Sequence, residues 1–266
     1  MFKCYLCGNN SAEVVADKEK VRFNVDCKFL KCLKCDLVQM YPQKEMSYEG
    51  YGEKKDFKGS KRKVKISKYL KRYVKRGERA FEVGCGEGDN IKYLLKRGVL
   101  ACGIDLETGN GYESFALNIK QDFIYAIHLA EHLADPKEFV CWMKENLKPN
   151  TERDGYTILD GGKWLLEIPC IDDPLIKLYK NKAYDKFCWY PYHLFFYSSK
   201  TIKKLFDGMN GKIIRRQEYG VVNHLRWLFR GKPGNWNPHI PIIDDVYKWV
   251  LCRLGYSDSL IVVGNV

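Results

Sequence analysis

A glycine-rich turn, 84–88, constrains the fold of this chain more than any other stretch of its 266 residues. The apolar segment before the turn predicts a short strand over 79–83, and apolar residues at helical spacing predict a helix over 89–96. A second strand is expected over 101–104, with Asp105 at its end. Strand, glycine turn, helix and strand form a βαβ unit, which predicts a ligand site at the carboxyl ends of the strands.

The spacing of the glycines indicates the kind of ligand. Gly84, Gly86 and Gly88 form G-x-G-x-G, whereas a dinucleotide fingerprint has its third glycine one residue further on. Glu82 lies two residues before the first glycine, and a carboxylate there suits a ligand with a positive centre better than one with a pyrophosphate. S-Adenosylmethionine (SAM) carries a sulfonium and an amino group and has no phosphate. We therefore predict a SAM site, in which Asp105 accepts both ribose hydroxyls and the glycines allow a close backbone approach.

Two CxxC pairs near the N-terminus predict a metal site. Cys4 and Cys7 form the first pair, and Cys32 and Cys35 form the second, with 24 residues between them. Each pair can form a turn that points two thiolates at one ion, and four thiolates suit tetrahedral zinc. Because no coordination position stays open, the zinc is expected to be structural, in a segment too short to have a sufficient core. Cys27 is a spare thiol, since only Cys32 completes a CxxC pair.

The other cysteines and the N-terminus bear on the compartment. Eleven cysteines is an odd number, and MFKCYLCGNN lacks the apolar core of a secretory signal, so a reduced, cytoplasmic chain is expected. No apolar run reaches the ~18 residues of a membrane-spanning helix, so no membrane span is expected.

Cys85 suits a small filler in the glycine loop. Five cysteines are expected to be buried apolar residues: Cys102, Cys141, Cys170, Cys188 and Cys252.

Positive charge is concentrated in one segment. Residues 54–79 hold thirteen Lys and Arg against two acids, and so carry +11 of the formal net charge of +12. One interpretation is an anionic partner such as RNA, a phosphorylated substrate or acidic lipid. The other is the solvated face of an amphipathic helix, because Val64, Tyr69, Leu70 and Val74 recur at helical spacing.

These motifs together resemble the class I SAM-dependent methyltransferases. FEVGCGEG is similar to the first motif of that family, GIDL to the end of its second strand, and HLAEHLADP to the end of its fourth strand. HLFFYSSKTIKKLF looks like its late helix. CLKCDLVQMYPQ followed by YEGYGEKKDF is similar to a subgroup with a zinc ribbon ahead of the methyltransferase fold, which includes sugar, surface-polysaccharide and ubiquinone-type O-methyltransferases. The resemblance implies an α/β fold with a Rossmann-like doubly wound sheet and a small N-terminal zinc ribbon.

The resemblance also implies a set of cofactor-binding residues, namely Glu82, Gly84, Gly86, Gly88, Asp105, Leu106 and His128. The chain departs from the family pattern in the segment that usually contacts adenine. Only 16 residues (106–121) separate Asp105 from Asp122, whereas the family usually places there a helix, a third strand and the acid that contacts adenine. Leu106, Glu107 or residues near Asn118 could take over that contact, and the sequence leaves this open.

Candidate catalytic residues follow the predicted fourth strand, 122–128. Methyl transfer to a hydroxyl needs a base, and histidine suits that role near neutral pH. By resemblance, Glu131 and His132 lie at the mouth of the cofactor pocket, which makes His132 the best candidate base. In ubiquinone-type enzymes the equivalent pair can also hold a divalent cation, so metal ligation and simple packing stay open as alternatives. His193 is a further candidate, because the aromatic stretch 189–197 suits either a substrate-pocket wall or a core strand.

Later elements are less informative about chemistry. Strands are expected over 163–168, 212–218 and 259–264, with an apolar helix near 242–254. Asn223, His224 and Arg226 suit either a polar cluster for an anionic or sugar substrate or a surface loop.

We divide the chain into a zinc ribbon (1–45), a lid segment and basic helix (46–79), and a SAM-binding methyltransferase domain (80–266). Tyr48 and Tyr51 are spaced like the tyrosines that cover the cofactor in the subgroup, and ordinary packing is the alternative.

The leading hypothesis is O-methylation of a small polar metabolite or a saccharide, of surface-polysaccharide or natural-product type. An rRNA or tRNA methyltransferase that uses the basic helix is the first alternative. Against RNA, no Asn-Pro-Pro-Tyr type motif for base methylation is present, and the charge is confined to one helix. The second alternative is a non-catalytic binding protein in which the shortened adenine region has abolished cofactor binding. The oligomeric state is not predicted.

Overall fold

The structure is a computed structural model of the chain. It describes residues 2–18, 27–42, 67–105, 118–153, 156–158, 161–189, 193–207, 211–232 and 240–266. The chain divides into two compact units. Unit 1 comprises Met1–Lys44, Ala130–Ala134 and Glu167–Val262. Unit 2 comprises Glu45–Leu129, Asp135–Leu166 and Val263–Val266.

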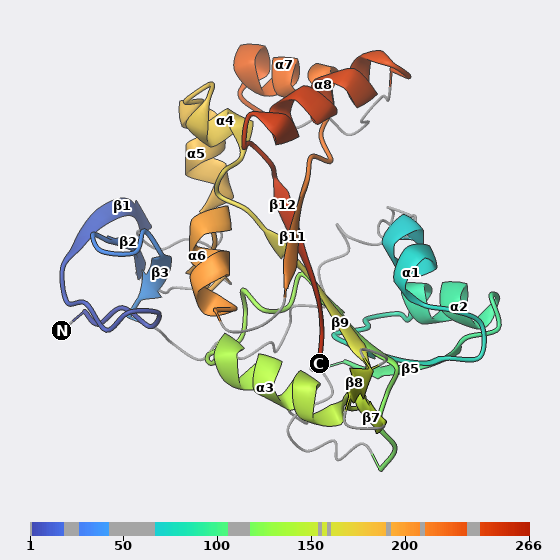
Figure 1. The fold of residues 1–266 in the computed structure, drawn as a ribbon. Helices are drawn as coiled ribbons and strands as arrows, with labels where there is room; N and C mark the ends of the chain where they lie inside the picture. The colour runs from blue at the N-terminus through green and yellow to red at the C-terminus, as the bar shows by residue number, and fades with distance from the viewer. Residues whose placement is uncertain are drawn as a thin grey trace. The chain divides into compact units, whose positions relative to one another are not determined.

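The glycine turn lies in a βαβ element of unit 2, as the sequence predicts (Figure 1). β4 (Arg79–Val83) leads through the turn into α2 (Asp89–Leu95), and β5 (Leu100–Ile104) follows. β4 pairs in parallel with β5 on one side and with β6 (Phe123–Ile127) on the other. Because all three strands run in the same direction, the segments that follow β4, β5 and β6 leave from one edge of the sheet.

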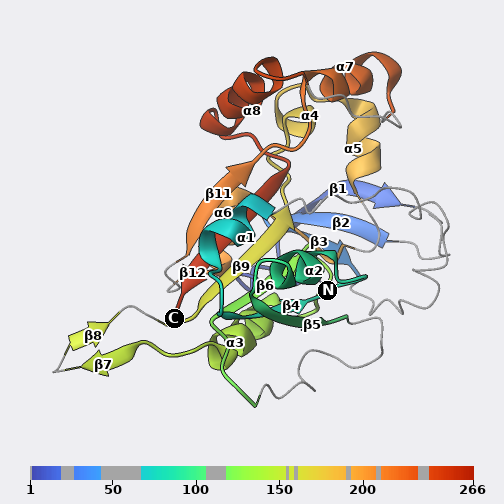
Figure 2. The ribbon, with the colours of Figure 1, turned by 90° about the vertical axis from the view of Figure 1, so that its right-hand side faces the viewer.

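The largest sheet has six strands in the order β11-β12-β9-β6-β4-β5 (Figure 2). Its further members are β9 (Lys163–Pro169), β11 (Lys212–Arg216) and β12 (Ser259–Asn265), which confirms the three predicted late strands to within two residues. Within the part of the chain that the structure describes, β5 is the last strand at its edge, which fits the short segment after Asp105. Together with its helices, this sheet forms the predicted α/β fold class.

Two helices and a hairpin complete the described part of unit 2. α1 (Ser67–Tyr73) buries Leu70 and exposes Arg72, which confirms the amphipathic helix over those residues; the rest of the basic segment, 54–66, lies outside the described residues. α3 (Pro136–Asn146) begins at Asp135, whose side chain accepts hydrogen bonds from two backbone N–H groups of the first turn. β7 (Thr151–Arg153) and β8 (Tyr156–Ile158) form an antiparallel hairpin.

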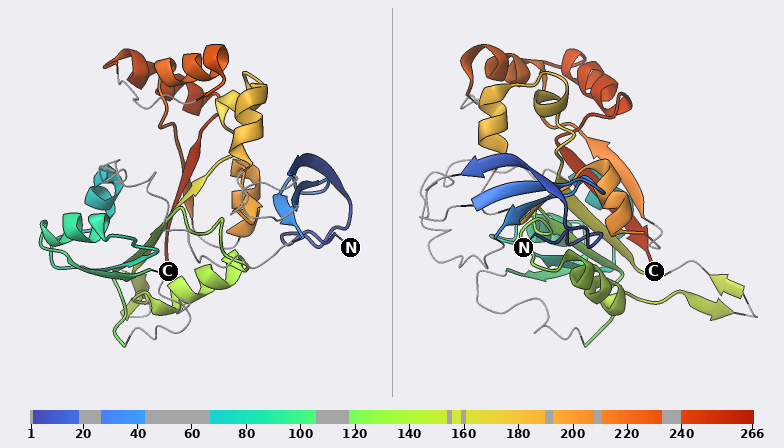
Figure 3. Two further views of the ribbon diagram at one scale, coloured as in Figure 1. Left: turned by 180° about the vertical axis from the view of Figure 1, so that it is seen from behind. Right: turned by 90° about the vertical axis from the view of Figure 1, so that its left-hand side faces the viewer.

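A second, antiparallel sheet belongs to unit 1 and has the order β1-β2-β3-β10. Its first three strands, blue in Figure 3, come from the N-terminal segment: β1 (Ala12–Lys18), β2 (Cys27–Cys32) and β3 (Val38–Tyr41). The fourth strand, β10 (Phe195–Phe196), comes from much later in the chain and pairs with β3. The N-terminal sheet is therefore completed by a strand that no local sequence pattern near it could supply.

Unit 1 also contains five helices within its described residues. They are α4 (Pro174–Lys177), α5 (Lys182–Cys188), α6 (Ser199–Leu205), α7 (Val221–Arg230) and α8 (Ile243–Arg253). α8 confirms the predicted apolar helix near 242–254. α6 begins with a reciprocal capping box between Ser198 and Thr201, which satisfies two backbone N–H groups at its start.

The structure corrects two expectations and leaves others outside the described residues. Of the five cysteines predicted to be buried, Cys170 is buried, and Cys188 and Cys252 are half-buried. Cys102 and Cys141 are exposed, so the prediction is wrong for them, because Cys102 lies on an edge strand of the sheet and Cys141 on the outer side of α3. Tyr48, Tyr51 and Leu106 lie outside the described residues. Among the described helices, none combines the length and the apolar content that a membrane crossing requires.

Candidate active site

The glycine loop takes a backbone conformation that other residues rarely adopt. Gly84, Gly86 and Gly88 have φ angles of 78°, 49° and 73°. The N–H groups of Gly84 and Cys85 both donate to the carbonyl of Ile104 at the end of β5, at 2.8 and 3.0 Å. These two bonds hold the start of the loop against the neighbouring strand. A side chain at Gly84 would bring its Cβ within 3.3 Å of Leu129 Cδ1, so this glycine is needed for packing as well.

Glu82 lies on β4, between β6 and β5, and is almost completely buried. Its Oε1 accepts a hydrogen bond from Asn90 Nδ2 at 2.8 Å, and its Oε2 accepts one from the hydroxyl of Tyr125 at 3.1 Å. Burial raises the pKa of Glu82 to about 7, although both hydrogen bonds favour the ionised form. A positive group bound at the loop would favour the carboxylate and lower this pKa.

Asp105 closes the other side of the loop. Its Oδ2 accepts a hydrogen bond from the backbone N–H of Gly86, so the carboxylate at the end of β5 lies directly beside the glycines. The structure therefore brings together Glu82, the three glycines and Asp105, as predicted. It places His128 immediately after β6, exposed and with a φ of 52°.

Sequence reasoning missed three residues that position this loop. Asn90 and Tyr125 hold the Glu82 carboxylate, and Gly103 allows β5 to approach β4 and α2. A Cβ on Gly103 would lie 2.5 Å from the Glu82 carbonyl oxygen and 2.9 Å from Ile91 Cδ1. The sequence does contain a signal for Tyr125. Aligning the two neighbouring parallel strands places its hydroxyl-bearing side chain opposite Glu82.

A second cluster, in unit 1, consists of Glu131, His132 and His193. Their candidate ligand atoms lie within 4.8 Å of one another. His132 Nε2 is 3.9 Å from Glu131 Oε1, and the two imidazole rings meet edge to face with centroids 4.8 Å apart. The N–H groups of Leu194 and Phe195 both donate to the carbonyl of Glu131, at 2.8 and 3.2 Å, which fastens the His193 segment to the Glu131 segment.

This cluster has the groups for proton transfer or for metal ligation. Two imidazoles and one carboxylate can take up a proton from a hydroxyl, and the same set can ligate a divalent cation. The structure thus unites all three predicted catalytic residues, although their roles remain predictions.

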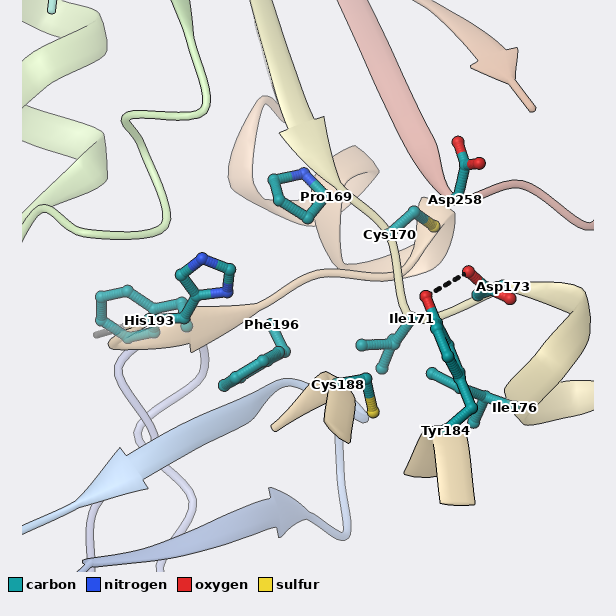
Figure 4. Close-up of a pocket in the computed structure, with 11 residues that line it drawn as sticks. Pro169, Cys170, Ile171, Asp173, Ile176, Tyr184, Cys188, His193, Phe196 and Asp258 are labelled. Carbon is teal, nitrogen blue, oxygen red and sulfur yellow. Dashed lines mark hydrogen bonds between the residues drawn. The ribbon is translucent and has the colours of Figure 1, made fainter. Parts of the chain in front are cut away.

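His193 also lines a cavity of about 220 Å³ in unit 1 (Figure 4). Phe196 and Tyr184 contribute aromatic walls, and Asp173 and Asp258 contribute carboxylates. Ligand pockets usually have volumes of roughly 300–1,000 Å³, so this cavity suits a small ligand or one end of a larger one. Burial raises the pKa of Asp173 to about 6 and that of Asp258 to about 7.

The hydroxyl of Tyr184 donates to Asp173 Oδ2 at 2.8 Å, which fixes one carboxylate at the wall, as the dashed line in Figure 4 shows. The cavity therefore combines an apolar surface with two acidic groups and one imidazole.

His224 lies inside α7 and is buried, which excludes the surface loop, one of the two alternatives that the sequence left open for it. Its Nδ1 is 2.6 Å from the hydroxyl of Tyr247, and its Nε2 is 3.3 Å from Gln217 Nε2. Burial lowers the pKa of His224 to about 4, and the ring is therefore neutral at pH 7. A neutral, buried imidazole with these partners serves packing between α7 and α8.

The four predicted zinc ligands also come together, within unit 1. Cys4 Sγ and Cys35 Sγ are 3.5 Å apart, and Cys7 Sγ and Cys32 Sγ are 3.6 Å apart. Tetrahedral zinc with Zn–S bonds of about 2.3 Å requires sulfur–sulfur distances of about 3.8 Å, so the donor set fits the ion. Burial opposes ionisation of Cys32, but N–H groups of the second CxxC turn outweigh it and lower its pKa to about 6.

Parallel strands joined by a βαβ connection, with a glycine loop between two carboxylates, are typical of the class I SAM-dependent methyltransferases. The donor groups fit SAM, because Glu82 and Asp105 supply negative charge beside a loop of positive-φ glycines. The family described as "Methyltransferase domain" matches residues 59–215, more than half of the chain. The chain therefore belongs to this methyltransferase family.

The solved structures that match the chain are distant in sequence. A SAM dependent methyltransferase from Archaeoglobus fulgidus is 15% identical, with 76% of this chain and 93% of that chain covered and a TM-score of 0.45. The YcgJ protein from Bacillus subtilis is 15% identical, with 75% and 97% covered and a TM-score of 0.46. A methyltransferase from Mesorhizobium loti is 11% identical, with 76% and 97% covered and a TM-score of 0.42. No curated protein matches the chain.

Proposed function

We propose that this methyltransferase transfers a methyl group to a hydroxyl oxygen of a small polar metabolite or a saccharide, with His132 as the base. The observation that carries the proposal is the cluster of Glu131, His132 and His193, one member of which lines the cavity of unit 1. An imidazole that removes a proton is what a hydroxyl acceptor requires, because a neutral hydroxyl is a poor nucleophile. Carboxylates in the cavity wall can accept hydrogen bonds from further hydroxyls of the acceptor.

Each residue of the cluster has a distinct proposed role. His132 takes the proton of the acceptor hydroxyl, and its Nε2 lies 3.9 Å from Glu131 Oε1. The buried Glu131 carboxylate stabilises the imidazolium that forms, because opposite charges interact strongly away from water. His193 orients the acceptor, since it belongs to both the cluster and the cavity wall.

The glycine loop is the proposed SAM site. SAM supplies an electrophilic methyl group with a neutral thioether as leaving group. Glu82 and the N–H groups of the loop bind the methionine part, and Asp105 accepts hydrogen bonds from the ribose hydroxyls. Along the chain, only two residues separate His128, at the end of β6, from Glu131.

We also propose that Cys4, Cys7, Cys32 and Cys35 hold one structural zinc ion. Three of the four thiols are buried, and the set has no vacant position for a substrate. The ion would stabilise the N-terminal strands, which have little apolar core of their own.

The alternative acceptor is RNA, and one observation favours it. α1 exposes Lys71 and Arg72, and further cations precede the helix in sequence. Changing Lys61, Arg62 and Lys63 together to Ala would abolish salt-dependent RNA binding if RNA is the acceptor, and would leave methylation of a small acceptor unchanged if it is not.

The decisive experiment follows methyl transfer from labelled SAM by the purified protein. The acceptors are a panel of saccharides, phosphorylated metabolites and tRNA. Label in a saccharide hydroxyl that depends on His132 supports the proposal. Label only in tRNA supports the alternative, and SAM binding without transfer to any acceptor class contradicts the proposed base.

A further inference from the structure

The outward surfaces of α7 and α8 are unusually apolar. Large apolar side chains on the two helices and the turn before α8 are exposed, among them Phe229 at 83%, Ile242 at 76%, Leu254 at 65% and Trp249 at 60%. Leu225 and Leu228 on α7, and Val246 and Val250 on α8, are exposed as well, and we call the exposed apolar side chains of the two helices the α7–α8 outer face. Scattered single apolar residues on a surface are ordinary, but many exposed ones on two helices that contact each other mark an interaction site; Figure 1 shows the two helices.

The inward side of α8 carries the polar groups, so the amphipathic pattern is reversed. Asp244 is buried, and its carboxylate oxygens accept hydrogen bonds from the N–H groups of Val221 and Ile240 at 3.0 and 2.9 Å. The Tyr247 hydroxyl lies 2.6 Å from His224 Nδ1 and 2.8 Å from the Tyr179 hydroxyl. Because these contacts anchor the inner side, the helix cannot turn its apolar residues inward without breaking them. The exposure is thus built into the packing.

Cations outnumber acids on the segment that carries the α7–α8 outer face. In the described residues of the segment 221–254, Arg226, Arg230, Lys232, Lys248 and Arg253 oppose two acids, Asp244 and Asp245, of which only Asp245 is exposed. The guanidinium of Arg253 lies over the ring of Trp249, 5.2 Å from its centroid. Exposed apolar side chains, a tryptophan and a phenylalanine that alternate with Lys and Arg along short helices form the pattern of helices that lie in a membrane interface.

We propose that the α7–α8 outer face binds the surface of a lipid bilayer that contains anionic phospholipid. α7 and α8 have 10 and 11 residues, so each is about 15–17 Å long and can lie on a bilayer but not cross it. A second copy of the chain is a poorer occupant, since a two-fold contact would press two positively charged faces together. Anionic head groups neutralise these charges while the apolar side chains enter the boundary with the acyl chains.

Sedimentation with vesicles tests the proposal directly. The full chain is mixed with phosphatidylcholine vesicles that contain or lack phosphatidylglycerol, at low and high salt. We expect binding to the phosphatidylglycerol vesicles that weakens with salt, and little binding to phosphatidylcholine alone. Equal binding to both lipids, or none to either, overturns the proposal.

Variants locate the binding surface. The pair Phe229→Ser and Trp249→Ser should lower the partition coefficient at least ~10-fold, because each side chain contributes buried apolar surface. Arg230→Gln with Lys232→Gln should lower it by ~10-fold or more, because two cations that attract the anionic head groups are removed. The matched control is Leu95→Ser with Leu100→Ser, two exposed apolar residues off this face, which should bind like wild type.

Circular dichroism establishes that each variant is folded. Loss of binding in the control pair, or its retention in both face variants, contradicts the assignment. Sedimentation equilibrium without lipid tests whether a second copy of the chain occupies the face. If wild type forms a dimer that Trp249→Ser dissociates, and does not bind vesicles, the face is a dimer interface and the proposal is overturned.

Discussion

The hydroxyl of Tyr125 on β6 donates a hydrogen bond to Oε2 of Glu82 on the adjacent strand β4, at 3.1 Å. The two residues are register partners in parallel strands, so the pairing of the sheet itself aims the hydroxyl at the carboxylate. Asn90 holds the other carboxylate oxygen from the first turn of α2. Glu82 is therefore held in one orientation beside the glycine loop, and its charge state matters for both stability and ligand binding.

The raised pKa of Glu82 predicts a pH-dependent stability. Because its pKa is about 7 in the fold against an ordinary 4.5, its contribution is present below about pH 4.5 and is lost as the pH rises through about 7. Urea unfolding at about pH 4.5 and 8 should show that wild type loses up to about 3 kcal/mol more than Glu82→Gln over this range. The control variant Asp173→Asn alters a different buried carboxyl, so it should still show the decrease in unfolding free energy that Glu82 causes. Identical pH dependence in wild type and Glu82→Gln would contradict the prediction.

Gly103→Ala should destabilise the protein by about 1–3 kcal/mol, because overpacking at a strand–helix contact forces backbone shifts. The new Cβ would lie 2.5 Å from the Glu82 carbonyl oxygen, a backbone atom that cannot rotate away. Thermal and urea unfolding measure the change. Cys102→Ala, on the same strand but exposed, is the control and should stay within about 0.5 kcal/mol of wild type. A wild-type-like Gly103→Ala would mean that β5 and β4 can separate at little cost.

Asp105→Ala should weaken SAM binding by at least ~100-fold, because two charge-assisted hydrogen bonds to ribose are lost. Isothermal titration calorimetry measures the Kd. Asp89→Ala removes an exposed carboxylate on α2, close in sequence to the loop, and should leave affinity nearly unchanged. If both variants bind SAM equally well, the ribose role of Asp105 is excluded.

His132→Ala should lower turnover by ~100-fold or more while the Kd for SAM stays at the wild-type value. The split between kcat and Kd separates a base from a residue that merely supports the cofactor loop. Added imidazole should restore part of the activity, which a structural role would not allow. Unchanged turnover in the variant would discard the assignment and leave His193 as the candidate.

Cys32→Ser should release the proposed zinc ion and lower the melting temperature, because three thiolates hold zinc less firmly than four. Metal analysis of the purified protein should give one zinc per chain in wild type and less than one in the variant. Cys141→Ser, at an exposed position, should retain both the zinc and the melting temperature. Wild-type protein that folds equally well after treatment with a chelator would contradict a structural zinc.

Local sequence patterns predicted much of the fold. Alternation and apolar runs placed β4, β5, β6, β9 and β12 to within a residue or two, since the spacing of apolar residues reports which face of an element is buried. The sequence also predicted the glycine loop with Glu82 and Asp105, because these residues lie at the ends of two neighbouring strands. It predicted the two CxxC pairs because the two cysteines of each pair are close together in the chain.

Only the tertiary structure decided the longer-range arrangements. It brought His193 to Glu131 and His132, gave β3 the partner β10, and turned the apolar side of α8 outward. The exposure of Cys102 and Cys141 and the burial of His224 also depend on which elements pack together. The spacing of apolar residues within a segment indicates that one side of the helix or strand is apolar, but it does not indicate which element packs against that side. That choice depends on strand order and on hydrogen bonds between residues far apart in sequence, which form only when the whole chain packs.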